Sequence, residues 1–160
     1  KKYPDMQLEF YINANPQLME KLLDYKLDIA FITGFPNYND LISLKSFDDD
    51  LFLIEPKFKN YSNSLIGYKK DSSHYKFLVE YEKSKGNNEF KTIFIENYEV
   101  MLGCVKSGMG KAYLSKKIID KYGYTNDLKL TKLPNELETY LVCRKDYEPM
   151  ISEYLKKIRF

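Results

Sequence analysis

The chain has 160 residues, 44% of them apolar and 30% charged, a globular composition that excludes disordered, collagen-like and disulfide-scaffold classes. Its 25 basic and 23 acidic side chains leave a net charge of +2, and only Arg144 and Arg159 are arginine. Because arginine is the residue that makes bidentate hydrogen bonds to phosphates and base edges, we do not expect this segment to bind nucleic acid itself. The apolar runs are far shorter than the ~18 residues of a membrane span, so we expect no membrane segment.

The N-terminal part of the chain predicts a strand, a helix and a second strand. Apolar and polar residues alternate over 6–12, which is typical of a half-buried strand. Asn15 and Pro16 suit the N-cap and first turn of a helix, which we expect to end near Tyr25. Residues 27–32 are almost wholly apolar, as in a strand covered on both faces. Together these elements predict a right-handed βαβ unit.

The rest of the chain alternates strands with helices, which indicates the α/β class. We expect strands at 51–54, 64–68, 91–95, 111–114, 128–133 and 138–143, and helices at 72–85, 97–105, 115–122 and 147–158. Turns are expected at 48–50 and 134–135. Residues 57–63 are charged and lack glycine, so we interpret them as a linker and place the start of a second lobe near residue 60.

The chain offers little for catalysis or metal binding. His74 is the single histidine, and without a second base it predicts a solvated surface residue rather than part of a triad. The acidic run at 48–50 lacks the alternating oxygen ligands of a calcium loop. Cys104 and Cys143 have no Cys or His near them at metal spacing and predict two buried thiols in a reducing compartment. We therefore expect no enzyme activity, no metal and no cofactor.

Residues 103–111 superficially resemble a phosphate-binding loop. That loop requires Lys directly after the final Gly of its frame and then Ser or Thr, whereas here Met109 follows Gly108. We interpret Gly108 as a helix C-cap and Gly110 as a point of close backbone approach that opens a strand.

Polar residues follow several predicted strands where helices begin, and this placement predicts a binding site. Ligands of open α/β sheets bind beyond the carboxyl ends of the strands, and helix N-termini there favour carboxylates and other anions. The alternative is that each Asn or Ser only caps its own helix. The candidate positions are the stretches 13–15, 33–34, 68–73 and 96–97, each of which follows a predicted strand. From them we select as candidate binding residues Asn13, Asn15, Thr33, Gly34, Tyr68, Lys69, Ser72, Glu96 and Asn97.

Four further stretches occur in order: Tyr3-Pro4-Asp5 with a strand, a helix and LDIAFI up to residue 32, FDDDLFLIEP at 47–56, VMLGCVKSGMGKAYL at 100–114, and YLVCRK at 140–145. Each is similar to a stretch of the effector-binding domain of LysR-type transcriptional regulators. Together they cover nearly the whole chain.

This resemblance implies a two-lobed, periplasmic-binding-protein-like (type 2) α/β fold, with mixed sheets flanked by helices and the family's first strand and helix missing. Lobe one would hold residues 1–63 and 138–160 and lobe two residues 64–137, with an effector cleft between them. The resemblance adds the loop near Gly110 to the pocket residues. It also places Lys111 where the family usually has an apolar residue, so we expect this side chain to face the cleft or a dimer contact.

The resemblance further implies a cytoplasmic homodimer or homotetramer that senses a small carboxylate, amino acid or aromatic acid. DNA binding would belong to an N-terminal winged helix-turn-helix that is absent from this chain. A second hypothesis is an extracytoplasmic solute-binding protein of an uptake system. An enzyme of the same fold, such as a deaminase or dehydratase relative, is disfavoured because acid and base residues do not converge.

Overall fold

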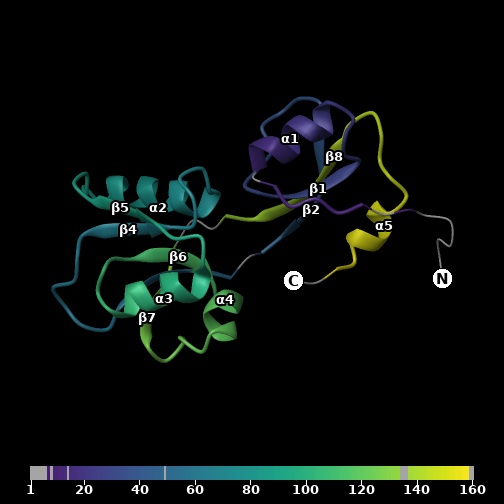
Figure 1. The fold of residues 1–160 in the computed structure, drawn as a ribbon. Helices are drawn as coiled ribbons and strands as arrows, with labels where there is room; N and C mark the ends of the chain where they lie inside the picture. The colour runs from purple at the N-terminus through teal and green to yellow at the C-terminus, as the bar shows by residue number, and fades with distance from the viewer. Residues whose placement is uncertain (1–6, 8, 14, 49, 134–136, 159–160) are drawn as a thin grey trace.

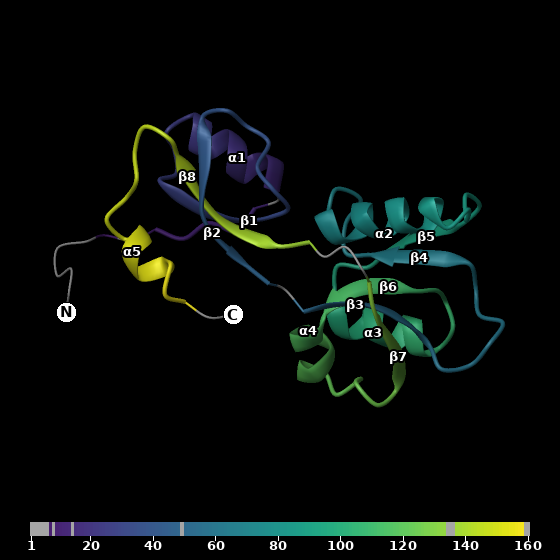
Figure 2. The same cartoon turned by 180° about the vertical axis from the view of Figure 1, so that it is seen from behind.

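The computed structural model describes residues 7, 9–13, 15–48, 50–133 and 137–158. Figures 1 and 2 show its helices and strands gathered into two groups, with the chain passing between the groups twice. We call them the terminal unit, which holds residues 7–47 and 139–158, and the central unit, which holds residues 51–133. The expected turn at 134–135 and the motif Tyr3-Pro4-Asp5 lie outside the described residues.

The terminal unit is one antiparallel sheet covered by a helix. Its elements are α1 (Asn15–Leu23), β1 (Ile29–Thr33), β2 (Leu41–Phe47), β8 (Thr139–Arg144) and the single turn α5 (Ser152–Leu155). The strand order is β1-β8-β2, and β8 runs antiparallel to both neighbours. Leu18 and Leu22 of α1 pack on Ala30, Ile32 and Val142 of the sheet, which removes the apolar stripe of the helix from water.

The central unit combines two sheets with three helices. β3 (Leu51–Pro56) lies between β6 (Ala112–Ser115) and β7 (Leu128–Lys132) in an antiparallel sheet, and β4 (Ser64–Gly67) pairs in parallel with β5 (Lys91–Phe94). The helices are α2 (Ser73–Ser84), α3 (Tyr98–Lys106) and α4 (Lys116–Lys121). A bridge between Leu65 and Lys111 joins the two sheets, and buried apolar residues of both sheets share two core clusters.

Local signals set the helix boundaries of the central unit. Ser72 is the N-cap of α2 and accepts a hydrogen bond from the Tyr75 amide, and Asn97 caps α3 through the Val100 amide. Gly108 follows the C-cap of α3 with φ +88°, a left-handed conformation that glycine adopts without strain. The predicted helix starts and the predicted C-terminal glycine are therefore confirmed.

The predicted βαβ unit is wrong. Residues 9–12 form no strand, and Phe10 and Ile12 are 87% and 99% exposed. β1 pairs with β8 and runs antiparallel to it, so the helix between residues 12 and 29 connects no parallel strands in the described chain. Alternation of apolar residues makes a strand only when a neighbouring strand accepts its hydrogen bonds.

The expected division at residue 63 puts β3 in the wrong group. β3 pairs with β6 and β7, so the chain leaves the terminal unit between β2 and β3, and residues 57–63 are a loop inside the central unit. The strand β2 was not predicted, because a β-bulge between Ser43 and Lys45 breaks its alternation of buried and exposed side chains.

Candidate functional site

A groove of about 480 Å³ lies where the terminal and central units meet. The terminal unit contributes the approach to α1 and the end of β1, and the central unit contributes the segment from the end of β4 to the start of α2. The groove is lined by Ile12, Asn13, Asn15, Gln17, Thr33, Tyr68, Lys69, Asp71, Ser72, Ser73 and His74. Most of these side chains are polar, which suits a small hydrophilic ligand.

The Asn15 side chain makes hydrogen bonds to two other residues that line the groove, Thr33 and Ser73. Its Nδ2 donates to the Thr33 carbonyl at 2.5 Å and its Oδ1 accepts from the Thr33 amide at 3.3 Å. Nδ2 also donates to Ser73 Oγ at 3.1 Å, and Ser73 Oγ lies 3.4 Å from the Thr33 carbonyl that it donates to. The sequence predicted Asn15 as a helix cap, whereas its amide binds the end of β1 and reaches the central unit.

The start of α2 supplies hydrogen-bond donors to the groove, and the charged side chains of the lining are Lys69 and Asp71. Ser72 and Ser73 stand at the N-terminus of this 12-residue helix, where backbone N–H groups and the helix dipole favour an anion. Lys69 is close by and forms an ion pair of 3.1 Å with Glu96. The hydrogen bond to Glu96 and its charge raise the pKa of Lys69, so the ammonium is charged at neutral pH.

Aromatic rings support the wall of the groove on the side of the central unit. Tyr68 stacks on Tyr98 with ring centroids 4.8 Å apart. His74 lies edge-on to Tyr113 at 6.3 Å, and Tyr113 stacks on Phe77 at 4.8 Å. The predicted solvated position of His74 is wrong, because the residue is half-buried and its Nε2 is screened from solvent.

The structure brings together six of the ten predicted binding residues. Asn13, Asn15, Thr33, Tyr68, Lys69 and Ser72 all line the groove. Sequence analysis missed Ile12, Gln17 and His74 as lining residues. Asp71 and Ser73 lie within residues 68–73, which it marked as candidate positions after a predicted strand, whereas nothing local marks Ile12 or Gln17.

Four predicted residues lie outside the lining of the groove. Glu96 forms an ion pair with the lining residue Lys69. Asn97 is a helix cap, and its side chain accepts a hydrogen bond from the Val100 amide at 3.0 Å. Gly34 has φ +87° and donates its amide to the Glu138 carbonyl at 2.8 Å. Each of these three groups has a partner within the fold.

Gly110 is the fourth, and its place is structural. A Cβ built on Gly110 would overlap the Ser64 backbone, with the Ser64 carbonyl carbon only 3.0 Å away, so the predicted close approach is confirmed. The neighbouring Lys111 does not line the groove, and its side chain is mostly buried. Its Nζ lies 2.6 Å from Glu82 Oε2 inside the central unit, which corrects the expectation that it points to the cleft.

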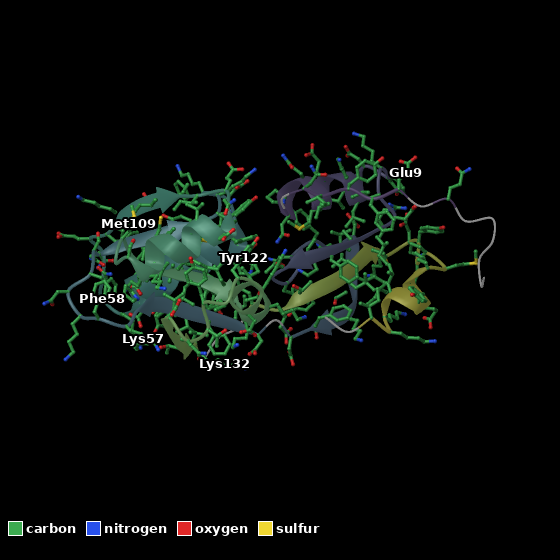
Figure 3. The ribbon with its side chains drawn as sticks, turned by 60° about the horizontal axis from the view of Figure 1, so that its bottom comes forward. Glu9, Lys57, Phe58, Met109, Tyr122 and Lys132 are labelled. Carbon is green, nitrogen blue, oxygen red and sulfur yellow. The ribbon has the colours of Figure 1, made fainter. Side chains whose placement is uncertain are left out.

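Exposed apolar side chains also gather away from the groove. Phe58 and Met109 are 51% and 45% exposed and lie at the end of the central unit farthest from the terminal unit (Figure 3). The Phe58 ring packs directly over Gly108. This patch is separate from the groove and contributes nothing to its chemistry.

Other features limit the chemistry of the described residues. Within the described ranges no three His, Cys, Asp or Glu side chains are grouped so that they could hold a metal ion, and no described helix is long and apolar enough to cross a membrane. Cys104 is half-buried and Cys143 buried, both as free thiols, and burial raises the pKa of Cys143, which makes it a poor nucleophile.

Comparison with known proteins identifies the family. The LysR substrate binding domain matches residues 1–152. The HTH-type transcriptional regulator SoxR of Arthrobacter sp. (strain TE1826) is 27% identical over 154 residues, which cover 91% of this chain and 53% of that protein. The chain thus spans about half the length of the curated relatives it matches.

Solved structures share the fold at low sequence identity. The effector binding domain of QuiR in complex with shikimate matches with a TM-score of 0.70 and 19% identity, over 98% of this chain and 81% of that one. The Synechocystis PCC6803 CcmR regulatory domain in complex with 2-PG matches with a TM-score of 0.72 and 16% identity, over 96% and 82%.

The mixed α/β fold is therefore that of the effector-binding domains of LysR-type regulators, which have the periplasmic-binding-protein type 2 fold. Such domains are regulatory and are not enzymes. The chain belongs to the LysR substrate-binding domain family, which confirms the resemblance found in its sequence.

Proposed function

We propose that the groove between the terminal and central units is the effector site of a LysR-type regulator, and that the two units are its two lobes. The observation that carries this proposal is the meeting in one groove of Asn15 at the start of α1, Thr33 at the end of β1, and Lys69 and Ser72 between β4 and α2. The α2 N-terminus and Lys69 supply positive charge, and the amide and hydroxyl groups supply hydrogen bonds. This combination favours a small anionic or amino-acid-like effector.

We propose further that the whole protein is a cytoplasmic homodimer or homotetramer that binds DNA through an N-terminal winged helix-turn-helix. Support comes from relatives that are named HTH-type transcriptional regulators and are about twice as long as this chain. The effector would act by binding one arrangement of the two lobes more tightly than another, since a ligand shifts an equilibrium only by its differential affinity. The arrangement of the lobes that the effector favours would then change the distance between the winged helix-turn-helix domains of the oligomer.

A thermal-shift screen of small organic acids and amino acids, with shikimate included because the QuiR domain binds it, tests this proposal. A ligand at about 100 times its Kd stabilises the chain by ~2.7 kcal/mol, which raises Tm by roughly 5–10 °C for a chain of this size. Lys69→Ala and Thr33→Val should reduce that rise, because they remove the ammonium and the hydroxyl of two residues that line the groove.

The matched control is Lys70→Ala, since Lys70 is exposed and adjacent but does not line the groove. Calorimetric titration of the compound found in the screen should give tenfold or more weaker binding for Lys69→Ala than for Lys70→Ala, since charge-assisted bonds contribute ~1.5–3 kcal/mol. Equal affinities for these two variants would refute the assignment of the groove.

A further inference from the structure

We infer that Asn15, Thr33 and Ser73 form a hydrogen-bonded latch that holds the terminal and central units in the arrangement seen here. The latch joins the start of α1, the end of β1 and the start of α2. It requires no bound effector, so it stands or falls independently of the function proposed above.

In the terminal unit, two hydrogen bonds to Thr33 hold the Asn15 side chain. Among the described strands β1 pairs only with β8, and the Asn15 amide binds both the amide and the carbonyl of Thr33 at the end of β1. The side chain thus takes the place of a peptide group in a neighbouring strand. Because two hydrogen bonds fix its orientation, the second hydrogen of Nδ2 is directed at Ser73.

The part in the central unit is equally constrained. Ser73 is the first residue of α2, a helix anchored in the core through Leu78 and Tyr75. Its Oγ accepts from Asn15 and donates to the Thr33 carbonyl. The bond from Asn15 has an ordinary length of 3.1 Å, whereas the 3.4 Å contact to the Thr33 carbonyl is long for a hydroxyl donor. A small rotation of one unit against the other therefore breaks the contact to Thr33 first, and a larger one breaks the bond from Asn15.

The topology makes such a rotation available. The chain passes between the units only at the β2–β3 and β7–β8 connections, as Figures 1 and 2 show. Units joined in this way move relative to each other unless a sizeable interface prevents it. The contacts of Ser73 reach Thr33, which pairs with Thr139 where the β7–β8 connection enters the terminal sheet. They add a non-covalent tie between the units beside one of the two connections and leave the other connection unsupported.

Hydrogen-bond capacity also links the latch to the groove. An Asn amide has two hydrogens to donate, and Thr33 and Ser73 take both from Asn15. A ligand in the groove that accepts a hydrogen bond from Asn15 must displace one of these partners. Such a ligand and the latch therefore compete for the two hydrogens of the Asn15 amide.

The test measures residual dipolar couplings of the ligand-free, ¹⁵N-labelled 160-residue chain. In the wild type one alignment tensor should fit the amides of both units. Ser73→Ala should leave the chemical shifts inside each unit nearly unchanged but give the two units separate tensors, because loss of the hydroxyl lowers the ratio of latched to unlatched molecules by roughly five- to tenfold.

Ser84→Ala is the matched control, since Ser84 lies on the same helix and its hydroxyl bonds only to Tyr81 among the described contacts; it should retain the single tensor. Asn15→Ala removes the same inter-unit bond from the other side and should repeat the separation if Ser73→Ala fails to fold. A single, unchanged tensor in both latch variants overturns the inference, and so do separate tensors in the wild type.

Discussion

Lys111→Met should destabilise the chain strongly, because it leaves Glu82 charged and buried. Glu82 lies on α2 with its side chain 5% exposed, and Lys111 precedes β6 with its side chain 13% exposed. Their charged atoms are 2.6 Å apart, and Asn87 Nδ2 donates to the same carboxylate oxygen at 2.7 Å. The methionine fills a similar volume but supplies no charge, so Asn87 remains as the carboxylate's neutral donor.

The size of the loss follows from the burial of both partners. Removing one member of a buried ion pair leaves an uncompensated charge and destabilises by about 3–5 kcal/mol, which is a large share of the ~5–15 kcal/mol that stabilises a typical domain. Backbone relaxation offers little relief, because the Lys111 amide and carbonyl are bonded to Ser64 and Ile66 at 3.0 and 2.8 Å. Lys111→Met combined with Glu82→Leu should recover most of the stability, since an apolar pair of similar volume replaces a buried ion pair at little net loss.

Urea unfolding at pH 7, followed by far-ultraviolet circular dichroism, measures these differences. The control is Lys26→Met, which breaks the exposed ion pair with Asp24 and should change the free energy of unfolding by less than about 1 kcal/mol. If Lys111→Met falls within about 1 kcal/mol of the wild type, like the control, then Glu82 is not held as a buried carboxylate and the reasoning is refuted.

Two other substitutions test the packing and the charge network of the central unit. Gly110→Ala should destabilise by at least ~1–3 kcal/mol, because its Cβ meets the Ser64 backbone; an unchanged thermal midpoint would contradict this. Burial raises the pKa of Glu55, but hydrogen bonds from Lys129 and Tyr61 outweigh it and leave the pKa lowered. The stabilising carboxylate is then present at neutral pH and lost as pH falls below about 5 through the lowered pKa. In Glu55→Gln the urea midpoint should therefore fall less between pH 7 and pH 3 than it does in the wild type. An equal fall of the urea midpoint in both proteins would argue against this charge network.

Much of the central unit was predictable because its signals are local. Ser72 and Asn97 cap helices through their own following turns, and Gly108 ends a helix by its own conformation. Such preferences depend on a few neighbouring residues, so a sequence pattern records them directly.

Strand pairing was less predictable because it depends on residues distant in the sequence. The alternation over 6–12 suits a strand, yet in the described part of that segment Phe10 and Ile12 face solvent. The near-continuous apolar run of β1 suggested a parallel strand, whereas its partner is β8 from the other end of the chain. No local preference distinguishes these outcomes.

The groove shows the same division between local and distant information. Strand-end placement predicted that Thr33 and Lys69 would lie near a ligand site, because the fold class fixes where strands end. It marked Asn15 through a strand over 6–12, which the described residues of that segment do not form. It did not predict that Asn15 would bind Thr33 instead of its own helix, since this bond depends on how α1 packs on β1. Lys111 was likewise misplaced because its partner, Glu82, lies on α2 and is far from it in the sequence.

The place of β8 in the terminal sheet has a consequence for biosynthesis. β1 and β2 do not pair with each other, and both pair with β8, which enters the sheet between them. The central unit, residues 51–133, is contiguous and is complete when the ribosome has still to deliver residues 139–144. The edges of β1 and β2 that bind β8 must therefore stay unpaired until residues 139–144 are synthesised, and we expect a chain that stops before residue 139 to hold a folded central unit next to two strands without their shared partner.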